Sequence, residues 1–226
     1  MRAMRWCVGD IVRELSLPPG YSIESLARAD VPFITCALKD WYPDVVVGSE
    51  SRHLTDAFYY RNVQFFDGKN EDEDDEKDTI GLVLRHEAAI IGLMMLSKDG
   101  PSRSVTSRMG ALAPEHRRAA LGFLGVMILD AAAKKMNAGV AYSFVTMKTR
   151  HQQVIAERYG FQIVGIMPAW DVDMIEPNRP KRVFEAVYAK VYAPASEWHI
   201  PPRDAMTKRT KELWDFLFGT GMTSGK

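Results

Sequence analysis

The stretch of sequence that decides the fold is Leu112-Ala-Pro-Glu-His-Arg-Arg-Ala-Ala-Leu-Gly122. Before it, the β-rich run from Ser104 to about Ala113 predicts a strand that Pro114 ends. After it, we expect a helix from near Arg117 to about Lys135. The apolar residues of this helix recur at helical spacing: Leu121, Leu124, Ile128, Ala132 and Met136. The stretch is therefore a strand-to-helix turn.

The turn also has features of an anion-binding site. The first turn of a helix has free backbone N–H groups and a partial positive charge. The small residues Ala119, Ala120 and Gly122 would let a phosphate come close to that backbone, and Arg117 and Arg118 would add full charges. The alternative is an ordinary turn with two solvated arginines. Taken alone, the stretch favours this alternative.

The neighbouring runs predict a sheet around the turn. Residues 79–85 and 88–96 are β-rich and are separated by His86-Glu87, which is the spacing of a hairpin. With the strand at 104–113 they form three antiparallel strands. A buried strand at 140–147 follows the helix, so its connection to the 104–113 strand implies a parallel βαβ step.

Other segments complete the expected fold. We expect further helices at 30–41, about 51–66 and 150–159, and further strands at 21–26, 161–167 and 183–192. The acidic run from Glu71 to Asp78 is interpreted as a solvated loop, with an acidic docking site as the alternative. The prediction is an α/β fold, in which a mixed, mostly antiparallel sheet of about seven strands is flanked by helices.

The pattern divides the chain into three parts. Residues 1–19 form an N-terminal arm that ends at Pro18-Pro19-Gly20, residues 20–194 form the main domain, and residues 195–226 form a C-terminal extension. The extension contains one amphipathic helix, expected from Arg203 to Phe218. Its apolar patch consists of Leu213, Trp214, Leu217 and Phe218. We expect this patch to dock on the main domain or on a second copy of the chain, which allows a homodimer.

Composition excludes several classes of protein. Among 226 residues, 29 Lys and Arg balance 29 Asp and Glu, which disfavours a dedicated nucleic-acid binder. No apolar run approaches the ~20 residues that span a bilayer, and the N-terminus does not have the pattern of a signal peptide. The two cysteines have no metal-ligand spacing. We therefore expect a cytoplasmic protein that contacts no membrane and holds no metal.

The order of elements and two short motifs resemble the GNAT superfamily of acyl-CoA-dependent N-acyltransferases. Members carry R/Q-x-x-G-x-G/A between a strand and a helix, commonly preceded by a proline. The matching string is 117–122, with Pro114 in the expected place, and Gly160-Phe161 matches the Gly-Phe that often ends the following helix. The resemblance covers residues 21 to 193. It implies the GNAT fold and acetyl-CoA as the acyl donor. The residues that it implies for binding CoA are Leu112, Arg117, Arg118, Ala119, Ala120, Leu121, Gly122 and Thr149.

The chain departs from the family pattern at three positions. The first motif glycine is Ala120, the asparagine that often contacts the pantetheine arm is Thr149, and the tyrosine that often protonates the leaving thiolate is Ala156. Two substitutes can be named as acid–base residues. His151 begins the same helix as Ala156, and Tyr159 lies one turn beyond it, although a solvent-exposed histidine and a packed aromatic are the alternatives. Tyr142 is a weaker candidate.

A carboxylate on the last strand is the third catalytic candidate. Strict alternation places Glu185 on one face with Val183, Val187, Ala189 and Val191. A buried carboxylate needs a partner or a raised pKa, so Glu185 is expected to meet an amine substrate or to pair with an arginine such as Arg182. By the resemblance, Trp41, Tyr42, Trp170 and Asp171 border the acceptor pocket, with Asp173 in the same predicted 168–182 loop.

The resulting functional prediction is transfer of an acetyl group from acetyl-CoA to a primary amine. The acceptor is expected to be a small molecule, with an aromatic amine as one option, and backbone N–H groups near Leu112 are expected to stabilise the oxyanion. Two alternatives stay open. The protein could be a CoA-binding regulatory module, or it could modify a protein or nucleic acid through the charges of Arg179, Lys181, Arg182 and the helix around 208–211.

Overall fold

The computed structural model describes residues 4–67, 76–117 and 120–219. The chain separates into two compact units, residues 1–192 and 193–226. The predicted acidic loop at 71–78 lies outside the described residues up to position 75. No helix among the described residues is both long enough and apolar enough to cross a membrane.

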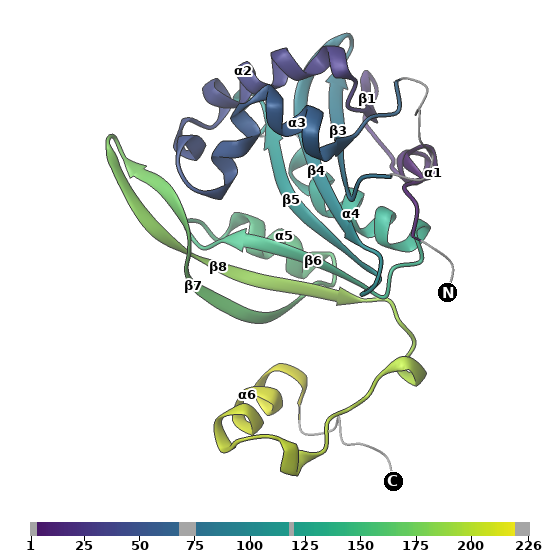
Figure 1. The fold of residues 1–226 in the computed structure, drawn as a ribbon, viewed down its shortest axis with the longest axis vertical. Helices are drawn as coiled ribbons and strands as arrows, with labels where there is room; N and C mark the ends of the chain where they lie inside the picture. Colours follow the sequence, from purple (N-terminus) through teal and green to yellow (C-terminus); the bar gives the residue numbers. More distant parts are fainter. Residues whose placement is uncertain (1–3, 68–75, 118–119, 220–226) are drawn as a thin grey trace. The chain divides into compact units, whose positions relative to one another are not determined.

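The first unit is built on one twisted, mixed sheet (Figure 1). Its strands are, in spatial order, β1 (Tyr21–Ser25), β3 (Thr79–His86), β4 (Ala89–Asp99), β5 (Ser104–Leu112), β6 (Val140–Thr146), β8 (Arg179–Val191) and β7 (Gln162–Glu176), with β2 (Val63–Gln64) paired to the side of β3. Only the pairs β2–β3 and β5–β6 are parallel among the described strands. The predicted fold class is confirmed, with eight strands in place of about seven.

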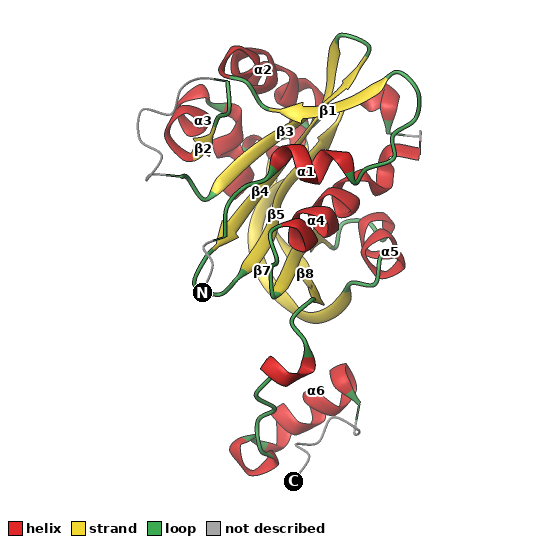
Figure 2. Ribbon diagram, turned by 90° about the vertical axis from the view of Figure 1, so that its right-hand side faces the viewer, coloured by secondary structure: helices red, strands yellow, loops and turns green. Residues whose placement is uncertain are grey.

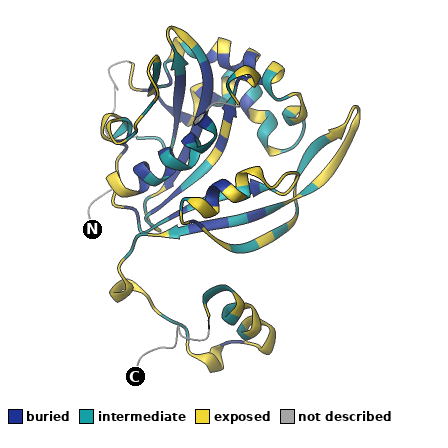
Figure 3. Ribbon diagram, turned by 180° about the vertical axis from the view of Figure 1, so that it is seen from behind, coloured by how far each residue is buried: buried dark blue, intermediate teal, exposed yellow. Residues whose placement is uncertain are grey.

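Helices cover both faces of this sheet (Figure 2). On one face, α1 (Val8–Arg13), α4 (Leu124–Lys135) and α5 (His151–Arg158) contribute buried residues to a core that includes Ile11, Ile128 and Ala156. On the other face, α2 (Val31–Trp41) and α3 (Asp56–Asn62) pack through Leu38 and Tyr59. Figure 3 shows that buried residues concentrate in the central strands and α4. The two cores lie on opposite sides of the sheet, as expected for a layered fold.

The two central strands separate in a way that creates a cleft. β5 and β6 run parallel and pair only from Ser104 and Val140 to Ser107 and Ser143. Beyond that point β5 stays with β4 as far as Leu112, whereas β6 stays with β8. The predicted parallel step is confirmed, and the loss of pairing opens a gap at the ends of both strands.

Three predicted elements have different boundaries in the structure. The helix expected from Arg117 begins at Leu124, after 3-10 turns at Pro114–His116 (η4) and Ala120–Phe123 (η5). Two glycines, Gly122 and Gly125, lie at that start, and glycine disfavours the helical conformation. Residues 118 and 119, both in the predicted anion site, lie outside the described residues.

The helix expected at about 51–66 is divided. The structure has a 3-10 helix, η3 (Ser49–Leu54), then α3, and then strand β2. Thr55 is extended and ends η3, and Val63 pairs with Thr79 of β3 instead of continuing α3. A β-branched residue next to a strand edge gains more from pairing than from a further helical turn.

The loop expected at 168–182 is a hairpin. β7 and β8 continue as paired antiparallel strands to a tight turn at Asn178, which has a positive φ of 58°. Register shifts interrupt the pairing at 163–165, 167–171 and 174–176. These bulges disturb the simple alternation of residue types, which is why the sequence pattern indicated a loop there.

The second unit contains α6 (Lys208–Phe218), which is shorter than the helix predicted from Arg203. A 3-10 turn, η7 (Arg203–Ala205), precedes it, and the side chain of Thr207 caps it by accepting a hydrogen bond from the N–H of Thr210 at 3.2 Å. The guanidinium of Arg203 forms an ion pair with Asp215. The rings of Trp214 and Phe218 lie 4.7 Å apart.

Candidate active site

The gap between β5 and β6 is a cavity of about 380 Å³. Several residues predicted for the site line it: Tyr42, Leu112, Arg117, Leu121, Gly122, His151 and Ala156. Glu185, Tyr159, Thr149, Trp41, Trp170 and Asp171 are not among the described residues of this lining. The cavity therefore brings together most of the predicted donor residues that the structure describes, and Tyr42 is the predicted acceptor residue that joins them.

Small residues keep the donor side of the cavity open. A Cβ atom at Gly122 would lie 3.5 Å from Nε2 of His151 and 3.8 Å from Cδ1 of Ile155. At Gly110 and Gly125, a Cβ atom would come within 3.6 and 3.7 Å of the sulfur of Met94. These are ordinary contact distances, so any side chain larger than alanine would extend into the space between β5, α4 and α5.

The side chain of Arg117 is bound to the chain itself. Its Nε donates to the carbonyl of Leu112 at 3.1 Å, and its Nη2 donates to the carbonyl of Trp41. The guanidinium carbon lies 4.2 Å from the centre of the Tyr42 ring, which is a cation–π distance. Arg117 therefore ties the end of α2 to the end of β5, and its contact with a phosphate stays a prediction.

The N–H group expected to stabilise an oxyanion has a partner. The backbone N–H of Leu112 donates to the hydroxyl oxygen of Tyr42 at 3.2 Å. Because Tyr42 lines the cavity, its hydroxyl is the partner of this N–H at the edge of the cavity. The sequence prediction placed Tyr42 at the acceptor pocket, and the structure places it where α2 meets β5.

The three acid–base candidates occupy different places. His151 is exposed at the cavity, beside Gly122. Tyr159 ends α5 with its ring 5.7 Å from that of Phe123, and its carbonyl accepts a hydrogen bond from Nζ of Lys190 at 2.9 Å. This position fits the packed aromatic considered as the alternative. Ala156 is buried and lines the cavity where the family pattern has a tyrosine.

Glu185 lies beyond the far end of the cleft. It sits opposite Thr146 of β6, a cavity-lining residue, and opposite Met167 of β7. Burial, followed by the charges of Asp171, Glu50 and Asp173, raises the pKa of Glu185 to about 7. The alternative ion pair with Arg182 is not formed, since Arg182 donates to the carbonyl of Ala169 at 3.2 Å.

The acidic neighbours of Glu185 come from two elements. Asp171 and Asp173 lie on β7, and Glu50 lies in η3, a segment that the sequence analysis did not connect with the site. One carboxylate oxygen each of Glu50 and Asp173 is buried and forms no hydrogen bond with a described residue. The other oxygen of Asp173 pairs with Nζ of Lys148. The oxygen of Glu50 without a hydrogen bond is Oε2, which lies 3.2 Å from Nδ1 of His53, within the distance of an ion pair if that histidine is protonated.

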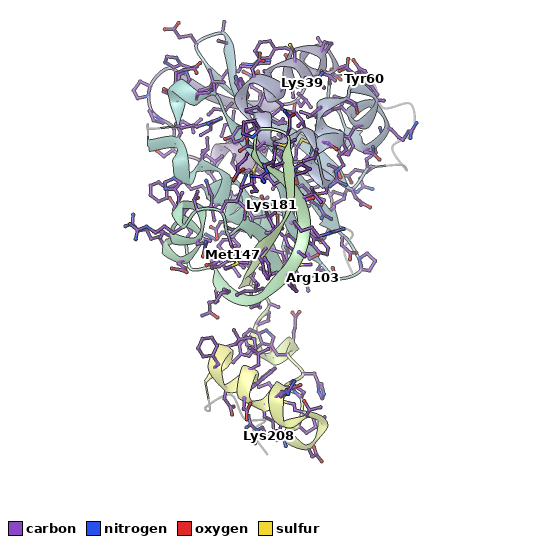
Figure 4. The ribbon with its side chains drawn as sticks, turned by 90° about the vertical axis from the view of Figure 1, so that its left-hand side faces the viewer. Lys39, Tyr60, Arg103, Met147, Lys181 and Lys208 are labelled. Carbon is purple, nitrogen blue, oxygen red and sulfur yellow. The ribbon has the colours of Figure 1, made fainter. Side chains whose placement is uncertain are left out.

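Two aromatic residues border this acidic region. The ring of Trp170 stacks on that of Phe144 at 6.2 Å with an angle of 10° between their planes, and Phe144 lines the cavity. Trp170 is 54% exposed, so one side of its indole faces solvent. Trp41 instead packs edge-on against Phe33 of α2. Trp170 thus contacts a residue of the cavity lining, whereas Trp41 packs within its own helix, and a role of either residue at an acceptor pocket stays a prediction. Figure 4 looks onto the hairpin, with Lys181 labelled.

Comparisons with known proteins give the fold a name. No protein-family model matches the chain, and no curated protein sequence matches it. Solved structures do match. A spermidine N-acetyltransferase from Vibrio cholerae aligns with a TM-score of 0.59 at 15% identity, over 77% of this chain and 95% of that one. A dodecameric structure of spermidine N-acetyltransferase from the same organism aligns with a TM-score of 0.57 at 15% identity over the same shares.

A third match comes from a different acetyltransferase. The IAA acetyltransferase from Bacillus cereus aligns with a TM-score of 0.53 at 16% identity, over 76% of this chain and 99% of that one. All three are acetyltransferases with the GNAT fold. The present chain therefore has the GNAT fold, as the motif at 117–122 and the order of elements predicted.

Proposed function

We propose that this protein is an N-acetyltransferase that transfers an acetyl group from acetyl-CoA to a primary amine. The observation that carries the proposal is the cleft between β5 and β6, whose lining residue Thr146 lies opposite Glu185, a carboxylate with its pKa raised to about 7. A thioester in the cleft and a base at its end are the two components that acyl transfer to an amine requires. The GNAT fold of the chain supports the same class of reaction.

The donor side of the cleft fits an acyl thioester. The glycines at 110, 122 and 125 leave room for a narrow chain, and the backbone of η5 and the start of α4 present N–H groups in the region where pyrophosphate would bind. The hydroxyl of Tyr42, which accepts the N–H of Leu112 and keeps its own proton to donate, would face the thioester carbonyl. When bound, acetyl-CoA supplies the activated acyl group.

The acceptor side supplies a base for the amine. An alkylamine has a pKa near ~10.4, so it reaches the site mostly as an ammonium ion. Glu185 would accept one proton from the ammonium ion, and the neutral amine would attack the thioester carbon. The C–N bond forms, the C–S bond breaks and the thiolate leaves, while the nitrogen gives its second proton to water or to the departing thiolate as the amide forms. A thiol of pKa ~8.5 can leave as the anion, so the alanine at position 156 does not prevent the reaction.

The charges near Glu185 favour a cationic acceptor. Glu50, Asp171 and Asp173 raise the pKa of Glu185 because their charges oppose its own, and an ammonium group would relieve that repulsion. Trp170 and Phe144 offer an apolar surface for the carbon chain or ring of the amine. We therefore infer a small primary alkylamine, and spermidine, after which the matching acetyltransferases from Vibrio cholerae are named, is the first compound to test.

The direct experiment is a panel of amines against acetyl-CoA with release of free thiol as the readout. We expect turnover with diamines and polyamines, and much slower turnover with arylamines at the same concentration. Saturable binding of CoA without thiol release from any amine would refute the enzymatic proposal. That outcome would support the alternative, a regulatory CoA-binding module. Ala156 favours the same alternative, because it stands in the cavity lining where the family pattern has a proton-donating tyrosine.

A further inference from the structure

Both carboxylate oxygens of Asp171 accept hydrogen bonds from the same chain. Oδ1 accepts hydrogen bonds from the backbone N–H groups of Ser49 and Val172 at 2.8 and 2.7 Å, and Oδ2 accepts one from the Ser49 hydroxyl at 2.7 Å. Burial would raise the pKa of Asp171, but these hydrogen bonds and the charge of Arg52 lower it below its ordinary value. Asp171 therefore stays ionised at neutral pH and holds the segment 48–54.

Gly48 shows how closely this segment meets the hairpin. A Cβ atom at position 48 would lie 2.1 Å from the carbonyl oxygen of Val172 and 2.5 Å from Oδ1 of Asp171. Gly48 also has a φ of 79°, which residues with a side chain rarely adopt. The backbone of the segment thus touches the backbone of β7, and only glycine fits at the point of contact.

The clamp joins the two elements that carry the carboxylates of the acceptor side. Asp171 lies opposite Val183, and Met167 lies opposite Glu185, so Asp171 and Glu185 share one face of the hairpin. Glu50 lies two residues after Gly48, inside the clamped segment. The position of Glu50 beside Glu185 therefore depends on the attachment of the segment to β7.

Other charged groups face the same region. Asp173 follows on β7, and Lys148 pairs with Asp173 and lies 3.7 Å from Asp44. The charge of Arg52, in the clamped segment, lowers the pKa of Asp171 and the pKa of Arg108 on β5. Because Lys148 and Asp173 are not part of the segment, release of the clamp would change the surroundings of Glu185 mainly through Glu50 and through water.

We propose that Asp171 is a positioning residue, which clamps the segment 48–54 to the β7–β8 hairpin and so holds the acceptor wall beside Glu185. The inference rests on the proposed function, because it assigns the clamp a role in proton acceptance from the amine. With the segment clamped, Glu185 stays partly shielded and next to Glu50, and it is a stronger base than an ordinary carboxylate.

The test is the titration of Glu185, followed by carbon NMR of labelled glutamate in the intact protein. The Glu185→Gln variant assigns the signal. We expect a midpoint of about 7 in the unaltered chain. In Gly48→Ala, which opens the clamp without removing a charge, the midpoint should fall by at least about one pH unit toward its ordinary value. The kcat/KM for the amine should fall about tenfold while the KM for acetyl-CoA changes less than about twofold.

The control is Gly165→Ala on β7, the strand that carries Asp171. A Cβ atom at Gly165 would meet no described atom within 4 Å, so this variant makes the same chemical change without touching the clamp. If Gly48→Ala does not fold, Ser49→Ala decides, since it removes only the hydrogen bond to Oδ2. We expect its midpoint to fall by at least about half a pH unit.

The titration needs no turnover, so its result is separate from the fate of the proposed function. A lower midpoint in Gly48→Ala or Ser49→Ala, with Gly165→Ala unchanged, supports the clamp even if no amine proves to be a substrate. An unchanged midpoint in folded Gly48→Ala and Ser49→Ala overturns the clamp, including in a protein that turns over amines well. An equal decrease in Gly165→Ala also overturns it, because the effect would then not depend on the contact with the segment.

Discussion

The donor side and the acceptor side of the cleft are built in opposite ways. The donor side is built from parts of the chain that lie near one another in the sequence, β5, η5, α4 and α5, with glycines and apolar residues around the cavity. The acceptor side consists of segments that are far apart in sequence, since Ser49 meets Asp171 across 122 positions. A local motif can make a cradle for a cofactor, whereas a charged acceptor wall needs tertiary contacts to keep its carboxylates close together.

The largest expected effect separates the chemistry of the acceptor side from binding on the donor side. Changing Glu185 to Gln removes the proposed base and keeps the shape of the side chain. With an alkylamine at pH 7 to 8, we expect kcat/KM to fall by at least ~10²-fold, while the KM for acetyl-CoA stays close to that of the unaltered chain. Steady-state thiol release measures both constants. Full activity of Glu185→Gln on a proven alkylamine would remove Glu185 from the mechanism.

The next prediction tests the donor side alone. Leucine at Gly122 would fill the space next to His151 and Ile155, so we expect the affinity for CoA to fall at least ~10-fold, as measured by calorimetry. Gly9→Leu is the matched control, because Gly9 is exposed on α1 and its Cβ would meet no described atom within 4 Å. Equal affinity of both variants for CoA would exclude this end of the cavity as the cofactor site.

A third prediction uses the place of His151 to separate binding from proton transfer. Because His151 lies beside Gly122, on the donor side, His151→Ala should raise the KM for acetyl-CoA a few-fold and leave the pH dependence of kcat unchanged. Tyr159→Phe should change neither constant, since the ring of Tyr159 packs against Phe123. A pH profile that loses a limb in His151→Ala would instead make His151 the base.

The smallest effect concerns stability on the acceptor side. The folded-state pKa of Glu185 is raised from 4.5 to about 7, so ionisation of this group works against folding. The stability that protonated Glu185 contributes to the folded state is fully present below about pH 4.5 and is lost as the pH rises through about 7. Glu185→Gln should therefore be more stable than the unaltered chain at pH 8, by about 1 kcal/mol after screening by solvent, and equally stable near pH 4. Urea unfolding at both pH values measures the difference. A variant that is less stable at pH 8 would show that the carboxylate has an unrecognised favourable partner.

The sequence features that predict the donor side are local. Each of these features is a short stretch of consecutive residues: Pro114, the small residues at 119–122 and Gly160-Phe161. Together they predicted the GNAT fold that the solved structures share. The alternation of side chains along the last strand also placed Glu185 on an otherwise apolar face, which made it a candidate. The same local reading assigned Arg117 to a phosphate, and it could not show that this side chain binds the carbonyls of Trp41 and Leu112.

By itself, then, the sequence determined the fold class, the parallel step next to the cleft and the carboxylate on the last strand, because periodicity and turn residues report local conformation. Tertiary structure alone decided which groups surround that carboxylate. Glu50 carries no signal of its own, and the bulged hairpin resembled a loop in the sequence. The hydrogen bonds from Ser49 to Asp171, on which the proposed clamp rests, likewise join segments that are far apart in the sequence. The physical reason is that the charge state of a carboxylate depends on every group within a few ångströms of it, and those groups come from segments that local patterns treat separately.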